Sequence, residues 1–134
     1  MNPQVNVHLI KTRVAILSME EDDIIRMTLD HKNGLDIDDI KDILSGILKI
    51  TGGKKALILG KSIHYNTPSR EVRAFAADFV NTDIIQAAAT VASNIMIKVA
   101  ANFFLKINKP PFPFKVFTEE KEAILWLKSL KTKI

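Results

Sequence analysis

A short apolar segment, Ala56–Leu59, constrains the fold more than any other part of the chain. Its four apolar residues follow one another without alternation, which is typical of a strand covered on both faces in an α/β layer. The chain turns polar after Gly60, and Thr67-Pro68 then has the sequence of a helix start. Because ligands and partners of open α/β sheets meet the chain at such strand-to-helix junctions, we expect the functional surface there.

Alternation and helical spacing divide the rest of the chain into strands and helices. Strands are predicted where apolar and polar residues alternate or an apolar run is short. Helices are predicted where a capping residue precedes apolar residues at spacings of three and four. Val5–Leu9 and Val14–Met19 are predicted to be two strands or one long strand, and the further predicted strands are Ile25–Asp30, Lys54–Leu59, Ile84–Val91 and Phe112–Phe117. The predicted helices follow the capping residues Asp36, Thr67, Ser93 and Thr118, and Thr51-Gly52-Gly53 ends the first of them.

The order of these elements indicates the fold class. The first strands are joined by short turns, as in an antiparallel meander, and the later strands alternate with helices. We therefore predict an α/β fold with a mixed β-sheet, antiparallel in its N-terminal strands and mostly parallel in its later strands, on which about four helices pack. No linker or internal repeat interrupts the sequence, so residues 1–134 are predicted to form a single domain.

Each helix is predicted to bury one apolar face. The first would bury Ile37, Ile40, Ile43, Leu44, Ile47 and Leu48, and the second Val72, Phe75, Ala76 and Phe79. The third would turn Met96, Val99, Ala100, Phe103 and Ile107 inward, and the last Ala123, Ile124, Leu127 and Leu130. These stripes would complete the core on both sides of the sheet.

Composition limits the classes of function. The absence of cysteine excludes disulfides, thiol nucleophiles and cysteine metal sites, and it suits a reducing compartment. The N-terminal residues lack the pattern of a signal peptide, and no apolar run reaches the roughly 18 residues that a membrane span needs. We therefore expect a cytoplasmic protein without a membrane span.

The net charge of +4 arises in the second half of the chain. Residues 1–67 carry nine basic and nine acidic side chains, whereas residues 68–134 carry ten basic and six acidic ones. The lysines mostly fall between apolar helix positions, as on a solvated face, and are not clustered as nucleic-acid binding requires. We therefore do not expect a nucleic-acid partner.

No motif supports a catalytic or cofactor site. Gly60-Lys61-Ser62 resembles the end of a phosphate-binding loop, but Lys55 stands where that loop needs its first glycine. His8, His31 and His64 lack the short, regular spacing of metal ligands. No G-x-S-x-G elbow is present, although the sequence leaves open an approach of His64 to Ser69. We therefore expect no metal, no cofactor and no enzyme activity.

The hydroxyl groups at the predicted start of the second helix have two interpretations. The simpler one is structural, because Thr67 and Ser69 can accept hydrogen bonds from free amides at a helix start. The other is regulatory, because the N-terminus of a helix stabilises a phosphate. Arg70 and Arg73 could add hydrogen bonds to a phosphate on either hydroxyl.

Aromatic residues concentrate near the C-terminus. Phe103 and Phe104 lie in the third predicted helix, and Phe112 and Phe114 lie in or beside the last strand. The simpler interpretation is that this helix packs against the following strand. The alternative is an apolar pocket or a dimer interface formed by these four residues.

The C-terminal run ANFFLKINKPPFPFKVFTEEKEAILWL resembles the ending of small bacterial proteins of the STAS or SpoIIAA-like fold class. The shared features are a helix ending in aromatic residues, a proline-marked strand reaching Phe117, and a helix that carries Ala123 and Trp126-Leu127. The element order and the junction of TGGKK with the following strand agree from about Val14 onward.

This resemblance implies a function without naming a partner. In the anti-sigma-factor antagonists of this fold, a partner kinase phosphorylates a serine or threonine at the junction after the central strand. Thr67 and Ser69 fall at that junction, but this chain has Asn66-Thr67-Pro68-Ser69 where the antagonists have Asp-Ser. The resemblance implies a regulatory domain that binds an unknown protein, with self-association as a further option. The SEC14-like branch of the class implies the alternative, an apolar ligand beneath the Phe103 and Phe104 helix.

Overall fold

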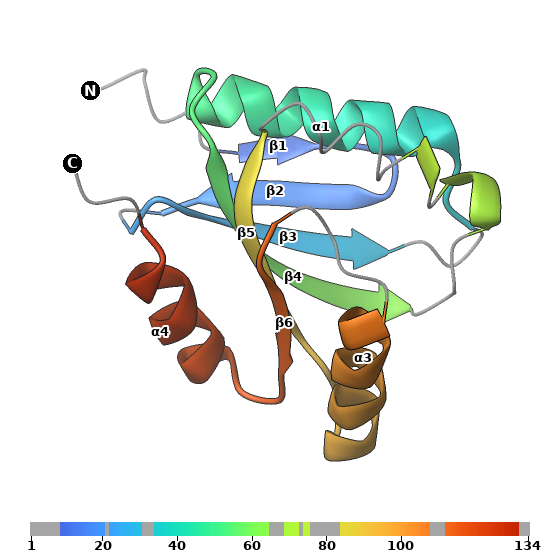
Figure 1. Cartoon of the computed structure of the whole chain (residues 1–134). Helices are drawn as coiled ribbons and strands as arrows, with labels where there is room; N and C mark the ends of the chain where they lie inside the picture. The colour runs from blue at the N-terminus through green and yellow to red at the C-terminus, as the bar shows by residue number, and fades with distance from the viewer. Residues whose placement is uncertain are drawn as a thin grey trace.

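The computed structural model of the chain describes residues 9–20, 22–30, 34–64, 69–72, 74–75, 84–107 and 112–131. Its centre is a six-stranded sheet whose spatial order, β1-β2-β3-β4-β5-β6, is the order of the strands along the chain (Figure 1). The strands are β1 (Leu9–Lys11), β2 (Ala15–Met19), β3 (Ile24–Asp30), β4 (Ala56–His64), β5 (Ile85–Val91) and β6 (Phe114–Phe117). The pairs β1–β2 and β2–β3 are antiparallel, and β3–β4, β4–β5 and β5–β6 are parallel, so the predicted mixed sheet is confirmed.

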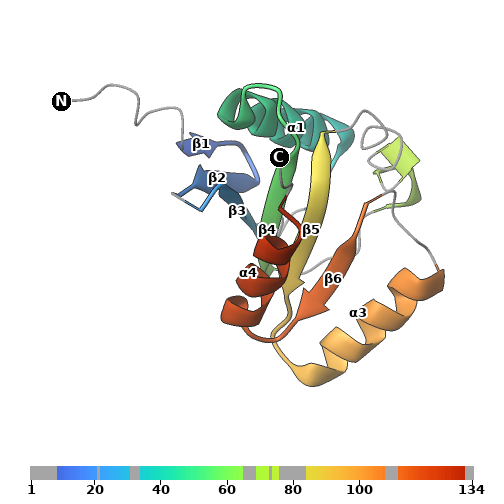
Figure 2. The same cartoon turned by 60° about the vertical axis from the view of Figure 1, so that its left-hand side comes forward.

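Helices cover both faces of the sheet. Helix α1 (Ile37–Thr51) lies on one face and α4 (Glu120–Ser129) on the other, while α3 (Ile95–Ile107) lies beside β6 (Figure 2). A short helical segment that includes residues 70–72 and 74–75 follows β4. The chain therefore has the predicted architecture, in which a short antiparallel meander is followed by strands that alternate with helices.

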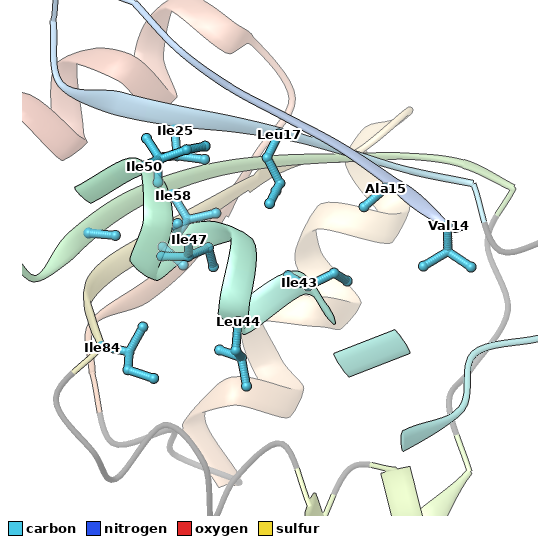
Figure 3. Packing of buried hydrophobic residues seen from close by; sticks show 12 residues of the cluster. Val14, Ala15, Leu17, Ile25, Ile43, Leu44, Ile47, Ile50, Ile58 and Ile84 are labelled. Carbon is cyan, nitrogen blue, oxygen red and sulfur yellow. The ribbon is translucent and has the colours of Figure 1, made fainter. Parts of the chain in front are cut away.

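Strand β4 is the central strand that its apolar run predicted. Ala56 and Ile58 belong to the larger buried cluster, which α1 covers (Figure 3), whereas Leu57 and Leu59 belong to a second buried cluster, which α4 covers. Residues 56–60 are all buried. Because successive side chains of a strand point to opposite faces, an unbroken apolar run requires cover on both sides.

Both ends of α1 have the predicted capping residues. Asp36 accepts a hydrogen bond from the Asp39 amide, and the Asp39 carboxylate accepts one from the Asp36 amide, which forms a reciprocal capping box. At the other end Gly52 adopts the left-handed conformation, with φ of 67°, and its N–H donates to the Leu48 carbonyl. The helix therefore begins and ends where its sequence signals indicate.

Several predicted boundaries are wrong by a few residues, and β4 continues to His64, well beyond the predicted end at Leu59. The first strand ends at Lys11 and not at Leu9, and residues 5–8 of the prediction lie outside the described residues. The last strand begins at Phe114 and not at Phe112. Asn94, and not Ser93, caps the start of α3, because the Asn94 Oδ1 accepts from the Ile97 amide. Helix α4 has Glu119 at its N-cap position in place of Thr118, without a side-chain capping bond.

The predicted orientation of α3 is also wrong. Met96, Val99, Phe103 and Ile107, expected to face inward, are exposed large apolar residues, and Ala100 is exposed as well. The side facing the sheet contains Asn102, whose amide group donates to the Val116 carbonyl and accepts from the Val116 N–H, each at 3.0 Å. Asn102 therefore occupies the place of a neighbouring strand beside β6, and α3 lies along the edge of the sheet instead of on its face. In α4, by contrast, Ala123 and Leu127 are fully buried, as predicted.

Candidate functional site at the carboxyl edge of the parallel strands

The predicted junction lies at one edge of the sheet, where the parallel strands β3 and β4 both end. Their register runs from Ile24 opposite Leu57 to Asp30 opposite His64, so the carboxyl ends of the two strands lie together. The start of α1 follows β3, and the short helical segment follows β4 (Figure 1). This is the edge at which open α/β sheets usually bind their ligands.

Ser69 lies at this edge and caps the short helical segment. Its Oγ accepts a hydrogen bond of 3.2 Å from the Val72 amide, and the residue is exposed. Ser69 itself is not helical and Arg70 is, so the helix begins after the predicted Pro68. Val72 is buried, as predicted, and Arg70 is exposed. Thr67 and Arg73, also predicted for this site, lie outside the described residues, as do Ala76 and Phe79 of the predicted apolar face.

An open hollow of about 390 Å³ separates this segment from the start of α1. Its lining combines apolar and acidic side chains: Leu35, Asp36, Ile37, Asp38, Ser69, Glu71 and Val72. Beside it, the Lys41 Nζ lies 5.7 Å from the centre of the Phe75 ring, a cation–π contact between α1 and the segment. The hollow therefore has apolar parts, three carboxylates and the Ser69 hydroxyl on one surface.

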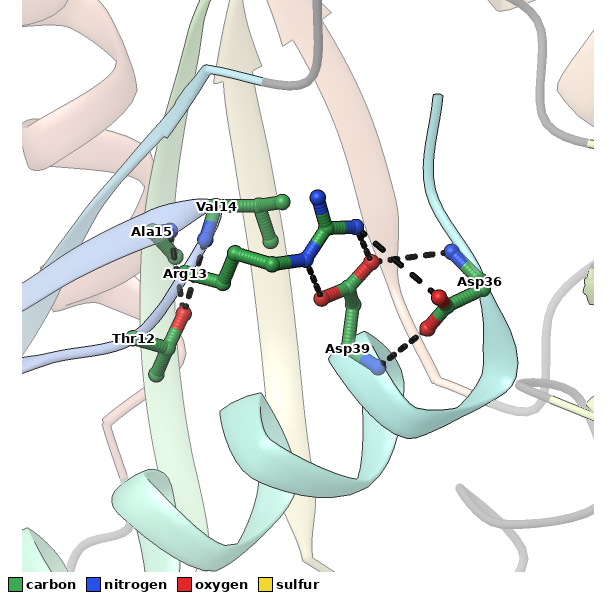
Figure 4. Close-up of polar contacts among 6 residues, drawn as sticks. All are labelled: Thr12, Arg13, Val14, Ala15, Asp36 and Asp39. Atoms are coloured by element: carbon green, nitrogen blue, oxygen red, sulfur yellow. Dashed lines mark hydrogen bonds and ion pairs between the residues drawn. The ribbon is translucent and has the colours of Figure 1, made fainter. Parts of the chain in front are cut away.

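An ion pair fixes the start of α1 beneath the hollow. The Arg13 guanidinium binds the Asp39 carboxylate in a bidentate manner, with Nε donating to Oδ1 at 3.0 Å and Nη2 to Oδ2 (Figure 4). Asp36 is 3.9 Å from the same guanidinium. The hydrogen bond from Arg13 lowers the pKa of Asp39, and although burial opposes this effect, the Asp36 amide adds to it. The same hydrogen bond raises the pKa of Arg13. The carboxylate is therefore held in its charged form, and it ties α1 to the loop between β1 and β2.

The sequence did not reveal this ion pair. The spacing Asp36-x-x-Asp39 was the available signal, because it has the form of a capping box with aspartate at both positions. Nothing in the sequence indicated Arg13, which is 26 positions away from Asp39.

The four predicted aromatic site residues do not form one described pocket. Phe112 and Phe114 are stacked with ring centres 6.1 Å apart and pack against the cluster beneath α1. Phe103 is 65% exposed on α3, so it does not line a cavity beneath that helix. The Phe104 side chain lies outside the described part of the structure. The exposure of Phe103 fits an interface better than a pocket.

The described residues contain neither a group of metal ligands nor a membrane-spanning helix. Within that part of the chain, no three His, Cys, Asp or Glu side chains are grouped so that they could hold a metal ion. In the same residues, no helix is both long enough and apolar enough to cross a membrane.

The comparisons with known proteins establish the family. Residues 17–131 match the family described as "Domain of unknown function (DUF7793)". The chain belongs to the DUF7793 family. No curated protein matches this DUF7793 chain at a significant level.

One solved structure supports the fold. The chain is similar to a crystal structure from Shewanella loihica PV-4, described as an uncharacterised protein of the DUF3478 family with a SpoIIAA-like fold. The TM-score is 0.56 at 12% sequence identity, and the match covers 88% of this chain and 98% of the other. A protein of unknown function from Arthrobacter sp. FB24 is 26% identical over 88% of this chain and 95% of its own, with a TM-score of 0.28. The DUF7793 chain therefore has a SpoIIAA-like fold, as its C-terminal sequence predicted.

Proposed function

We propose that this DUF7793 chain is a non-enzymatic regulatory domain that binds a partner protein at the carboxyl edge of its parallel strands. The observation that carries the proposal is the hollow between α1 and the short helical segment, with the exposed Ser69 in its lining. The resemblance to anti-sigma-factor antagonists supports the same edge and the same kind of residue.

The lining indicates the chemistry of the partner. Leu35, Ile37 and Val72 offer apolar contacts, and Asp36, Asp38 and Glu71 offer negative charge. A partner segment that carries both apolar and basic side chains complements this surface. Such a segment would bring Lys or Arg to the carboxylates and place its apolar groups between them.

Phosphorylation of Ser69 would act as an off switch at this surface. A phosphoryl group adds about −1.5 to −2 charges at neutral pH and would enter a hollow that three carboxylates already line. It would fill the space that the partner segment needs. It would also repel Asp36 and Asp38 on α1. Arg70 next to Ser69 offsets part of this repulsion but leaves the steric block in place.

The test compares two substitutions of nearly identical shape. Ser69→Asp places a charge at the hollow, whereas Ser69→Asn keeps a capping side chain without the charge. Proteins recovered from the native host by the wild type should also be recovered by Ser69→Asn and should be lost with Ser69→Asp. Ser45→Asp, which adds the same charge at an exposed position of α1, is the control. Equal recovery by Ser69→Asp and the wild type would contradict the switch.

A second measurement addresses the modification directly. Intact-mass and peptide analysis of the protein purified from its native host should detect a phosphate on the peptide that contains Ser69. If that peptide is fully covered and never phosphorylated under any growth condition, the proposed control by Ser69 is wrong. The proposal that a partner binds at this edge is then unaffected.

A further inference from the structure

Helix α3 presents an apolar surface on the outside of the molecule. Six large apolar side chains are exposed, from 47% for Ile97 to 77% for Met96. We call this surface the outer face of α3, and it consists of Ile95, Met96, Ile97, Val99, Phe103 and Ile107. Single exposed apolar residues are ordinary, but a helix that exposes a continuous set of them marks a binding surface.

The outward orientation of this face is built into the structure. The two hydrogen bonds between the Asn102 side chain and the Val116 backbone turn Asn102 toward the edge of the sheet. Lys98, Ala101 and Leu105, which share that side of the helix, are partly buried. With Asn102 fixed inward, the helical period turns the apolar positions outward. Rotating them inward would break both hydrogen bonds and leave Val116 unpaired at the edge of the sheet.

Charge favours an anionic surface over a second copy of the chain. Residues 95–107 contain no acidic residue, Lys106 is exposed on this helix, and Lys115 is exposed on the adjacent strand β6. Pairing the outer faces of two copies would bring lysines of the same sign together. An anionic surface instead attracts these lysines while the apolar side chains are buried.

The residue types favour lipid over a folded protein. The outer face consists of aliphatic side chains, one methionine and one phenyl ring. Residues 95–107 contain no Trp, Tyr or Arg, the residues that dominate binding energy at protein interfaces. A helix of 13 residues is about 20 Å long, which is too short to span a bilayer but long enough to lie in its interface.

We propose that the outer face of α3 docks this protein on an anionic lipid bilayer. The helix lies parallel to the bilayer surface, with Met96, Val99 and Phe103 among the acyl chains and with Lys106 near the phosphate groups. This surface is distinct from the hollow at the carboxyl edge, and the proposal does not depend on the function proposed for that hollow.

The experiment is co-sedimentation of the purified protein with vesicles. Vesicles of phosphatidylglycerol mixed with phosphatidylcholine should sediment the protein, and vesicles of phosphatidylcholine alone should sediment at least about tenfold less. The double variant Met96→Ser/Phe103→Ser should reduce binding to the anionic vesicles by at least about tenfold, because it removes two large apolar side chains from the inserted face. Lys106→Glu should reduce it in the same direction, and added salt should weaken wild-type binding.

Leu125→Ser is the matched control. Leu125 is exposed to a similar extent as Phe103 but lies on α4, so this variant should bind like the wild type. Equal urea midpoints for all variants will show that the changes act on binding and not on folding.

Three results would overturn the proposal. The first is the absence of sedimentation with anionic vesicles, and the second is wild-type binding by Met96→Ser/Phe103→Ser. The third is a dimer, measured by sedimentation velocity, that this double variant dissociates while vesicles do not compete with it. That result would assign the outer face to a second copy of the chain.

Discussion

Helices α1 and α3 each connect two neighbouring parallel strands, yet they use their apolar residues in opposite ways. Helix α1 buries Ile43, Leu44, Ile47 and Ile50 against the sheet. It packs so closely that a methyl group at Gly46 would lie 2.7 Å from the Leu17 side chain. Helix α3 attaches through the polar Asn102 and exposes its apolar residues. An apolar stripe therefore shows that a surface needs cover, but not that the sheet provides it.

The comparison is tested most strongly by the same substitution in both helices. Ile47→Ala should lower the free energy of unfolding by about 2–5 kcal/mol, because the side chain is fully enclosed and its removal leaves a cavity. Ile97→Ala should change it by less than about 0.5 kcal/mol, because that side chain is half exposed. Urea denaturation measures both values. A loss above about 2 kcal/mol for Ile97→Ala would show that α3 packs on its apolar side after all.

The anchoring of α1 should depend on pH. Asp39→Asn should lower the free energy of unfolding at pH 7 by about 1.5 kcal/mol, because it removes the charge that Arg13 binds. The pKa of Asp39 is lower in the folded protein than the value of about 3.9 in the unfolded chain, so the stabilisation is complete above that value. It is lost as the pH falls through the folded pKa. The difference between the wild type and Asp39→Asn should therefore shrink from pH 7 to pH 3.

Two features of the protein make this measurement specific. Asp22 also has a lowered pKa, because of its hydrogen bonds from Arg26, but it is present in both proteins and cancels from the difference. Asp42→Asn removes an exposed carboxylate from the same helix and serves as the control. A constant difference between the wild type and Asp39→Asn across this pH range would mean that the Asp39 charge contributes nothing to stability.

The attachment of α3 rests on one side chain. Asn102→Ala should cost about 1 kcal/mol, since it removes two hydrogen bonds at an edge where water can replace them. Hydrogen exchange at the Val116 amide should become faster, while exchange at the Gly52 amide, which closes α1, should be unchanged. Lys106→Ala, at an exposed position of α3, is the matched control. Unchanged exchange at Val116 would show that another group protects this edge.

The smallest expected effect has the opposite sign. Val99→Ala should raise the free energy of unfolding by about 0.5 kcal/mol, because alanine favours the helix and the exposed valine side chain contributes little packing. Thermal unfolding in the absence of lipid provides the measurement. A decrease instead of a gain would indicate that Val99 is covered in solution.

The sequence predicted those parts of the fold that depend on local pattern. The four apolar residues of Ala56–Leu59 identified the central strand, because alternation is absent only where both faces are covered. Asp36 and Gly52 marked the ends of α1 through backbone hydrogen bonds that involve only neighbouring residues. The SpoIIAA-like fold was also expected from the C-terminal residues, and the comparison of structures confirms it.

The orientation of α3 and the setting of Ser69 could not be predicted in this way. Whether a helix covers a face or an edge depends on distant partners, and an asparagine such as Asn102 in an apolar helix looks like a simple interruption. The negative charge around Ser69 arises because the start of α1 lies beside the segment after β4. Those residues are more than 30 positions apart in the sequence, so local pattern could not bring them together.

The strand order has a consequence for biogenesis. Because each strand pairs with the one synthesised just before it, the sheet can grow from β1 to β6 while the chain leaves the ribosome. Each strand can pair with its neighbour as soon as it has been synthesised. The loops that must close are therefore short, which favours rapid folding. Each newly added strand is the edge strand of the sheet until the next one pairs with it, and β6 is the last edge strand formed. Asn102 is made before β6, so the residue that protects this border is already present when the strand arrives.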